Sequence, residues 1–285
     1  MAIPVHHPAG GTIWRHADVA SAFLPPRHVD IWFPPGYSED RTRRYPVLYM
    51  HDGQNLFDPT LAFAGVDWGV AEAMIGLMDE GYPGALIVGV WNTPWRGREY
   101  MPALRAASAA GVQLHRHVVH EIGGPPESDS YLWFLAHELK PLIDSSYRTR
   151  RGPHDTFLMG SSMGGLISLY GLTEYPDVFG GAACLSTHWL VGGDLLVDSM
   201  AAMLPAAGTH RLYFDYGTEG VDAPYEPFQR RMDTHLQAAG YRAGYDWLTL
   251  RFAGADHNEA AWRARVHRPL AHLLSRDHVL PRPPW

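Results

Sequence analysis

The sequence has only one cysteine, Cys184, in 285 residues. A single thiol cannot form an internal disulfide, which excludes the disulfide-stapled scaffolds of small secreted domains. No apolar run reaches the roughly 18 residues that indicate a transmembrane helix. The first residues, MAIPVHHPAGGTIW, lack the basic and apolar regions of a signal peptide. From these absences we expect a soluble, cytoplasmic protein.

The sequence also lacks an excess of basic charge. Its formal net charge is −7 with histidine neutral, so its overall charge does not attract it to phosphate backbones or anionic lipid. We therefore expect neither nucleic acid nor a membrane as a partner. A small molecule is the partner class that remains, and a homo-oligomer stays possible.

Internal repeats, low-complexity segments and Gly/Ser-rich linkers are absent as well. The sequence therefore predicts a single domain over residues 1–285. We place its core at about 28–275, with an N-terminal extension at 1–27 and a tail at 276–285.

What the sequence does contain is an alternation of short apolar segments with segments of helix length. Strands are expected at 28–33, 45–50, 85–91, 155–160, 181–186, 211–217 and 246–252. Helices are expected at 67–80, 129–145, 163–175, 225–239 and 258–275, with Pro141 kinking the second. This alternation predicts an α/β fold, with a mostly parallel central sheet and helices on both faces. Ligands should then bind at the carboxyl ends of the strands.

The most specific motif lies in FLMGSSMGG, residues 157–165. The pattern G-x-S-x-G fits only with Ser162 at its centre, between an expected strand and an expected helix. Ser161 does not fit this register. The flanking glycines leave room for the strained turn that exposes a nucleophile. The same turn directs the backbone N–H of Met163, at a helix N-terminus, toward a developing oxyanion.

A serine nucleophile needs a base, and the base needs an orienting acid. Both should follow the serine in the chain, in the order serine, acid, histidine. His257, in RFAGADHNEAAW, lies in a polar loop after the last expected strand and is the candidate base. The loop after 211–217 offers Asp222 and Glu219. Asp222 is preferred because the loop has room to fold it back, Glu219 remains the alternative, and Asp215 is expected to be structural.

Further site residues are expected after the early strands. In YMHDGQNLFD, Gly53 allows a close backbone approach, and the backbone N–H of Gln54 is the candidate second oxyanion donor. Four aromatic residues at or just after strand ends are expected to line an acyl or aryl pocket: Trp91, Trp95, His188 and Trp189. Arg96 and Arg98 are expected to pair with Glu99 rather than to bind an anionic substrate.

No metal or other cofactor is expected. His115, His117 and His120 lie close together in the sequence, but no cysteine is near them and their spacing is not that of a zinc-binding H-E-x-x-H helix. We interpret them as part of a solvated segment. The role of the surrounding stretch, 103–124, is left open.

In combination, the motifs carry a family resemblance. YPVLYMHDGQNLFD, YLWFLAHELKPLIDSSYRT, FLMGSSMGGLISLY, YFDYGTEGVDAPYEPFQ and GADHNEAAW together resemble the esterase branch of the α/β-hydrolases, which is similar to enterochelin esterase, feruloyl esterase and esterase D. The resemblance covers about residues 28–275. It implies an α/β-hydrolase fold with a nucleophile at Ser162, an acid on the loop of Asp222, a base at His257 and no cofactor.

The expected function is that of a serine carboxylic-ester hydrolase that forms an acyl-enzyme, acting on a carbohydrate-linked or aryl ester. The alternatives are an esterase of a siderophore trilactone and a binding protein that keeps the fold without turnover. The sequence does not identify the acyl or the alcohol group of the substrate.

Overall fold

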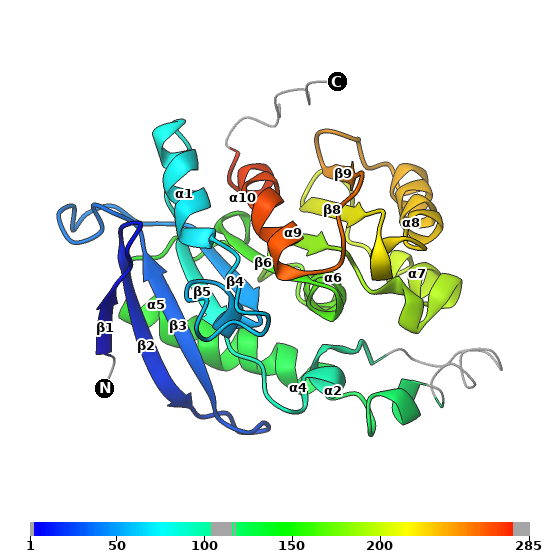
Figure 1. Ribbon diagram of the computed structural model, residues 1–285, viewed down its shortest axis with the longest axis horizontal. Helices are drawn as coiled ribbons and strands as arrows, with labels where there is room; N and C mark the ends of the chain where they lie inside the picture. Colours follow the sequence, from blue (N-terminus) through cyan, green and yellow to red (C-terminus); the bar gives the residue numbers. More distant parts are fainter. Residues whose placement is uncertain (1–2, 104–115, 117, 276–285) are drawn as a thin grey trace.

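One nine-stranded sheet runs through the protein, in the order β1-β2-β3-β5-β4-β6-β7-β8-β9. The computed structural model describes residues 3–103, 116 and 118–275, and Figure 1 shows their arrangement. The strands are β1 (Ile3–His6), β2 (Thr12–Val19), β3 (Arg27–Phe33), β4 (Val47–His51), β5 (Leu86–Val90), β6 (Thr156–Ser161), β7 (Gly181–Leu185), β8 (Arg211–Gly217) and β9 (Trp247–Phe252).

The sheet is mostly parallel, as the sequence predicts. All pairings from β5 through β4, β6, β7 and β8 to β9 are parallel. The pairings of β1 with β2, β2 with β3 and β3 with β5 are antiparallel. The seven predicted strands are found within two residues of their expected bounds, which confirms the α/β class.

The N-terminal residues differ from the expectation. The segment 1–27, expected to be an extension outside the core, supplies β1 and β2 to the sheet. The pairing of β2 with β3 shifts register between His16 and Val19, and Asp18 there has φ 50°. Such an irregularity breaks the alternation of apolar and polar residues by which a half-exposed strand is recognised in a sequence. The division of the chain into domains stays a prediction.

Helices cover both faces of the sheet (Figure 1). They are α1 (Val70–Asp79), α2 (Arg96–Tyr100), α4 (Ser128–Trp133), α5 (Lys140–Ser146), α6 (Met163–Glu174), α7 (Gly193–Ala201), α8 (Glu226–Ala238), α9 (Glu259–Arg265) and α10 (His267–Leu274). In β4, Val47 and Tyr49 contribute to one hydrophobic core, whereas Leu48 and Met50 contribute to the other. Helices α1, α9 and α10 close the second core, and α4 to α8 close the first.

The predicted helix at 129–145 is interrupted in a different way from the one expected. A π-helical segment, Phe134–Leu139, joins α4 to α5, and Pro141 lies in the first turn of α5. Proline is tolerated in a first turn because its missing N–H has no partner there in any case. The irregularity therefore precedes the proline.

The parallel strands end at the same edge of the sheet. The last residues of β4, β5, β6, β7, β8 and β9 are His51, Val90, Ser161, Leu185, Gly217 and Phe252. The loops that follow these residues carry the predicted site. Among the helices of the described residues, none combines the length and the apolar character needed to span a membrane.

Candidate active site

Ser162 occupies a sharp turn between β6 and α6. Its backbone has φ 57° and ψ −122°, a conformation that is strained for a residue with a side chain. The turn is held by its N–H, which donates to the carbonyl of Leu185 at 2.9 Å. A Cβ atom on Gly160 would lie only 2.7 Å from the backbone of Gly164, so the turn requires glycine at that position.

The two neighbouring serines have different surroundings. Ser161 is the last residue of β6, pairs with Leu185 across the sheet and is buried. Ser162 is only half-buried and stands at the turn. Met163 is the first residue of α6, where a backbone N–H has no acceptor within the helix. Its role as an oxyanion donor stays a prediction.

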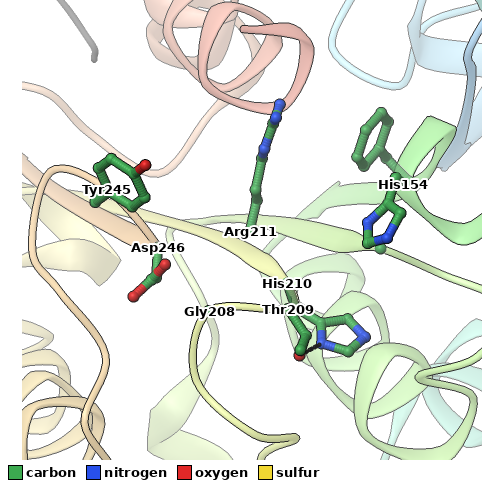
Figure 2. Close-up of a pocket in the computed structure, with 9 residues that line it drawn as sticks. His154, Gly208, Thr209, His210, Arg211, Tyr245 and Asp246 are labelled. Carbon is green, nitrogen blue, oxygen red and sulfur yellow. Dashed lines mark hydrogen bonds between the residues drawn. The ribbon is translucent and has the colours of Figure 1, made fainter. Parts of the chain in front are cut away.

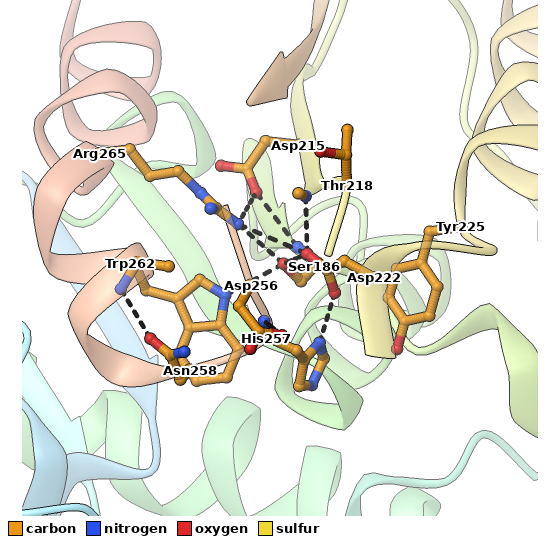
Figure 3. A network of polar contacts seen from close by, with 12 residues as sticks. Ser186, Asp215, Thr218, Asp222, Tyr225, Asp256, His257, Asn258, Trp262 and Arg265 are labelled. Atoms are coloured by element: carbon orange, nitrogen blue, oxygen red, sulfur yellow. Dashed lines mark hydrogen bonds and ion pairs between the residues drawn. The ribbon is translucent and has the colours of Figure 1, made fainter. Parts of the chain in front are cut away.

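His257 and Asp222 form a short hydrogen bond. The Nδ1 atom of His257 lies 2.6 Å from Oδ1 of Asp222, and the two side chains are 12% and 0% exposed (Figure 3). A carboxylate can only accept, so Nδ1 carries the proton and donates it. In the neutral ring, the other nitrogen, Nε2, is then left as an acceptor.

Asp222 remains ionised although it is buried. Burial raises the pKa of its carboxyl group, but hydrogen bonds from His257, from the Ser186 hydroxyl at 2.6 Å and from the Gly217 N–H at 2.7 Å outweigh burial and hold the pKa below its usual value. Glu219 is exposed, and its backbone carbonyl accepts the N–H of Asp222 at 3.1 Å. Of the two acids that the sequence offers, Asp222 is the one beside His257.

His188 contacts both the serine turn and His257. Its backbone N–H donates to the carbonyl of Ser162 at 3.2 Å, and its ring centre is 6.3 Å from that of His257. Its Nδ1 atom forms a 2.6 Å hydrogen bond with the hydroxyl of Tyr225. Burial, followed by the charges of His257 and Arg96, lowers the pKa of His188 to about 4, so this ring is neutral at physiological pH.

The loop after β4 is fixed by a charged pair. Asp52, with φ 57°, accepts from Nε and Nη2 of Arg96 at 2.7 and 2.8 Å, and from Nδ2 of Asn92 at 2.6 Å. A Cβ atom on Gly53 would lie 2.4 Å from the carbonyl carbon of Gly89, so glycine is required there. The next residue, Gln54, is half-buried. Its backbone N–H as the second oxyanion donor stays a prediction.

His51 is not a member of the candidate triad. It is buried at the end of β4, and its Nδ1 atom is 2.8 Å from the hydroxyl of Tyr131. Burial lowers the pKa of His51 to about 3, so the ring stays neutral. This agrees with the chain-order argument, which excludes a histidine that precedes the serine.

Comparisons with known proteins place this geometry in a family. The sequence model of the family described as "Putative esterase" matches residues 21–273. The chain belongs to this esterase family. A curated relative, the uncharacterized protein YbbA of Bacillus subtilis (strain 168), is 23% identical over 205 residues, which cover 68% of each chain.

Solved structures share the fold of this chain. An IroE-like serine hydrolase from Shewanella oneidensis has a TM-score of 0.70 at 19% identity, covering 92% of this chain and 78% of that one. A ferulic acid esterase from Anaeromyces mucronatus has a TM-score of 0.61 at 18% identity, with 92% and 91% covered. The siderophore hydrolase EstA from Aspergillus nidulans has a TM-score of 0.64 at 16% identity, with 93% and 96% covered. These similarities identify the α/β-hydrolase fold.

Two expectations for this esterase are wrong. Trp189 does not line an open pocket: it is 1% exposed, and its indole N–H donates to Oε1 of Gln229 at 3.1 Å within the core. Trp189 is the first residue of a short turn of 3-10 helix, and its indole contacts Gln229 of α8. Arg96 and Arg98 do not pair with Glu99, because they pair with Asp52 and Glu127, while Glu99 pairs with the buried Arg27.

Two of the other three predicted aromatic residues, Trp91 and Trp95, line a separate groove, and His188 is not among its lining residues. Trp91 is half-buried, and its indole N–H donates to Asp30 at 2.9 Å. Trp95 is 45% exposed. Both line a groove of about 300 Å³ beside the end of β5.

Sequence reasoning missed two residues that lie next to the Asp222 carboxylate, Ser186 and Arg265. Ser186 directly follows β7 and has φ 43°. Arg265 is buried on α9, three residues after Trp262. The N-cap Asn258, whose side chain accepts the N–H of Ala261, fixes the start of this helix next to His257. The cap was the sequence signal that could have placed the start of α9, and with it Arg265, near His257.

A second cavity lies at the opposite edge of the sheet. It has a volume of about 340 Å³ and is lined by residues at the amino ends of β6, β7, β8 and β9, including His154, Thr209, His210, Arg211 and Asp246 (Figure 2). Because Ser162 follows the carboxyl end of β6, this cavity is not part of the candidate active site.

Of the predicted histidine cluster, His115 and His117 lie outside the described residues, and only His120 lies within them. Within residues 3–103, 116 and 118–275, no three His, Cys, Asp or Glu side chains are grouped so that they could hold a metal ion.

The serine turn should be sensitive to one methyl group. Gly160→Ala places a Cβ atom against the backbone of Gly164 and should lower the free energy of unfolding by about 1–3 kcal/mol, the usual cost of overpacking. Gly152→Ala is the matched control, because its Cβ atom would meet nothing within 4 Å. Urea denaturation measures both variants. Equal stability of the two would show that the turn tolerates a side chain.

Proposed function

We propose that this member of the esterase family is a serine carboxylic-ester hydrolase that acts through an acyl-enzyme. Ser162 is the nucleophile, His257 the base and Asp222 the orienting acid. The observation that carries the proposal is the 2.6 Å hydrogen bond from His257 to a fully buried carboxylate. The strained backbone of Ser162, at a strand-to-helix turn, supports it.

The reaction follows from the protonation states. Nε2 of His257 accepts the Ser162 hydroxyl proton as Oγ attacks the ester carbonyl carbon. The ionised Asp222 stabilises the imidazolium that forms. The backbone N–H groups of Met163 and Gln54 donate to the oxyanion. The imidazolium then protonates the leaving alcohol, and a water molecule activated by the same histidine hydrolyses the acyl-enzyme.

The groove beside β5 supports a carbohydrate-linked or aryl ester as substrate. Its walls combine the aromatic rings of Trp91 and Trp95 with polar groups of Asn92. Asn92 donates from its side chain to Asp52 at 2.6 Å and from its backbone to Oε1 of Gln54 at 3.2 Å. The groove therefore adjoins the proposed oxyanion site. Aromatic surfaces with a few placed polar groups are typical of small-molecule sites.

Replacing the two serines separately should identify the nucleophile. Ser162→Ala should lower kcat/KM for p-nitrophenyl acetate by several orders of magnitude, since it removes the attacking atom, whereas Ser161→Ala should keep most of the activity. Stopped-flow and steady-state absorbance assays measure both variants. Near-equal losses would refute the assignment of Ser162, and a wild-type protein without turnover would indicate a binding protein.

The orienting acid can be tested with an isosteric pair. Asp222→Asn removes the charge that stabilises the imidazolium and favours the wrong tautomer of His257. It should lower kcat on the order of ten-thousand-fold, the cost of the same change in a serine protease. Glu219→Gln is the control and should stay within a few-fold of wild type, because its side chain is exposed. Comparable melting curves are required. Loss of activity only in Glu219→Gln would make Glu219 the acid.

A substrate panel tests the ester class. We expect kcat/KM to be at least about ten-fold higher for aryl esters and feruloylated sugars than for a cyclic siderophore trilactone, since the groove is aromatic. Trp95→Ala should lower that preference while leaving the turnover of a short aliphatic ester nearly unchanged. A clear preference for the trilactone would instead assign this protein to siderophore hydrolysis.

A further inference from the structure

A buried polar cluster lies directly behind Asp222 (Figure 3). It consists of Ser186, Asp215, Trp262 and Arg265, and we call it the acid-support cluster. Their exposed fractions are 0, 1, 5 and 2%. The cluster joins the end of β7, strand β8 and helix α9. Since α9 begins two residues after His257, the same segment carries the base and two members of the cluster.

The Ser186 hydroxyl can donate its proton to only one neighbour. Its Oγ atom is 2.8 Å from Nη2 of Arg265, 3.1 Å from the indole N–H of Trp262 and 2.6 Å from Oδ2 of Asp222. Guanidinium and indole nitrogens can only donate. The single hydroxyl proton must therefore point to Asp222. Arg265 and Trp262 thus fix the orientation of the Ser186 hydroxyl. This hydroxyl donates to Oδ2 of Asp222, whereas Oδ1 accepts from His257.

Arg265 is not placed as a simple partner of Asp215. One atom, Nη2, makes its contacts: 2.8 Å to Ser186, 3.0 Å to Oδ1 of Asp215 and 3.9 Å to Oδ2 of Asp222. Its Nε and Nη1 atoms are buried without a hydrogen-bond partner among the described residues. A pair formed for stability would favour two parallel bonds to one carboxylate. The guanidinium is instead directed at the junction of Ser186, Asp215 and Asp222.

Arg265 carries the positive charge of the acid-support cluster. Its Nη2 atom faces two buried carboxylates, at 3.0 Å from Asp215 and 3.9 Å from Asp222. Burial raises the pKa of Asp215, and the charge of Arg265 opposes that rise. Because these groups are shielded from water, their interactions are stronger than on the surface. Arg265 therefore acts on both carboxylates that lie next to His257 and Ser186.

We propose that Arg265, acting through Ser186, is a positioning residue that holds the Asp222 carboxylate in line with His257. The inference rests on the proposed function, since it assigns a purpose to the acid of that triad. Neither residue touches the substrate, so their loss should reduce the rate of the chemical step and leave substrate binding unchanged.

Ser186→Ala is the direct test because it removes the hydroxyl without removing a charge. We expect kcat for p-nitrophenyl acetate to fall about 10- to 100-fold, as on loss of an outer hydrogen-bond partner at metal sites, with KM within about two-fold of wild type. The downfield proton resonance of His257 Nδ1–H should shift or disappear. Thr187→Val is the matched control: it removes a neighbouring buried hydroxyl that bonds to the Cys184 carbonyl.

A pair of arginine variants tests the charge. Arg265→Lys keeps the positive charge and should retain more of kcat and of the resonance than Arg265→Met. Arg263→Met removes a charge from the partly exposed face of the same helix and should leave kcat unchanged. Arg265→Met deprives two buried carboxylates of their counter-charge and can fail to fold, in which case Ser186→Ala decides alone.

The outcomes separate the inference from the proposed function. If wild-type turnover depends on Ser162 but Ser186→Ala keeps both kcat and the resonance, the inference is wrong and the esterase stands. A lower melting temperature with unchanged kcat would make Ser186 purely structural and would also refute it. If wild type shows no turnover that depends on Ser162, the proposed function fails. The His257 Nδ1–H resonance can be recorded without turnover, so it still shows whether Ser186 orients Asp222.

Discussion

The hydrogen bond between Asp222 and His257 requires a charged carboxylate to persist where water cannot reach it. Removing a carboxylate from water is unfavourable unless other groups replace the lost hydrogen bonds. Here the Gly217 N–H and the Ser186 hydroxyl do so on one oxygen, and His257 does so on the other. Much of the surrounding structure, including the strained backbone at Ser186, is needed to bring these donors to one point.

The parallel sheet brings loops that are distant in the sequence to one edge. Ser162, Ser186, Asp222 and His257 follow β6, β7, β8 and β9, which are consecutive neighbours in the sheet. Adjacent strands are about 4.8 Å apart, so the loops at their carboxyl ends are within reach of one another. Each loop therefore has to extend only a short way to contribute its residue to the candidate site. The cavity on the opposite edge shares the strands but none of these loops.

The sequence predicted what depends on local pattern and missed what depends on tertiary contacts. Ser162 was singled out as the candidate nucleophile because its glycines and flanking elements are contiguous. Asp222 was preferred over Glu219 because the loop has room to fold it back. The 3-10 turn that buries Asp222 and exposes Glu219 leaves no periodic signal. Trp189 was misplaced because an aromatic residue after a strand can face the core or the cleft with the same local sequence. Arg265 was missed because a buried arginine on a helix is indistinguishable in sequence from an exposed one.

Covalent labelling by a serine-directed phosphonate tests most directly whether Ser162 is a nucleophile activated by His257. Mass spectrometry of the digested protein locates the adduct. Wild type should form one adduct, on Ser162, and the reaction should be strongly slowed in a His257→Ala variant, since that histidine must remove the hydroxyl proton. Labelling of Ser161 or of another serine, or equal labelling rates with and without His257, would contradict this assignment.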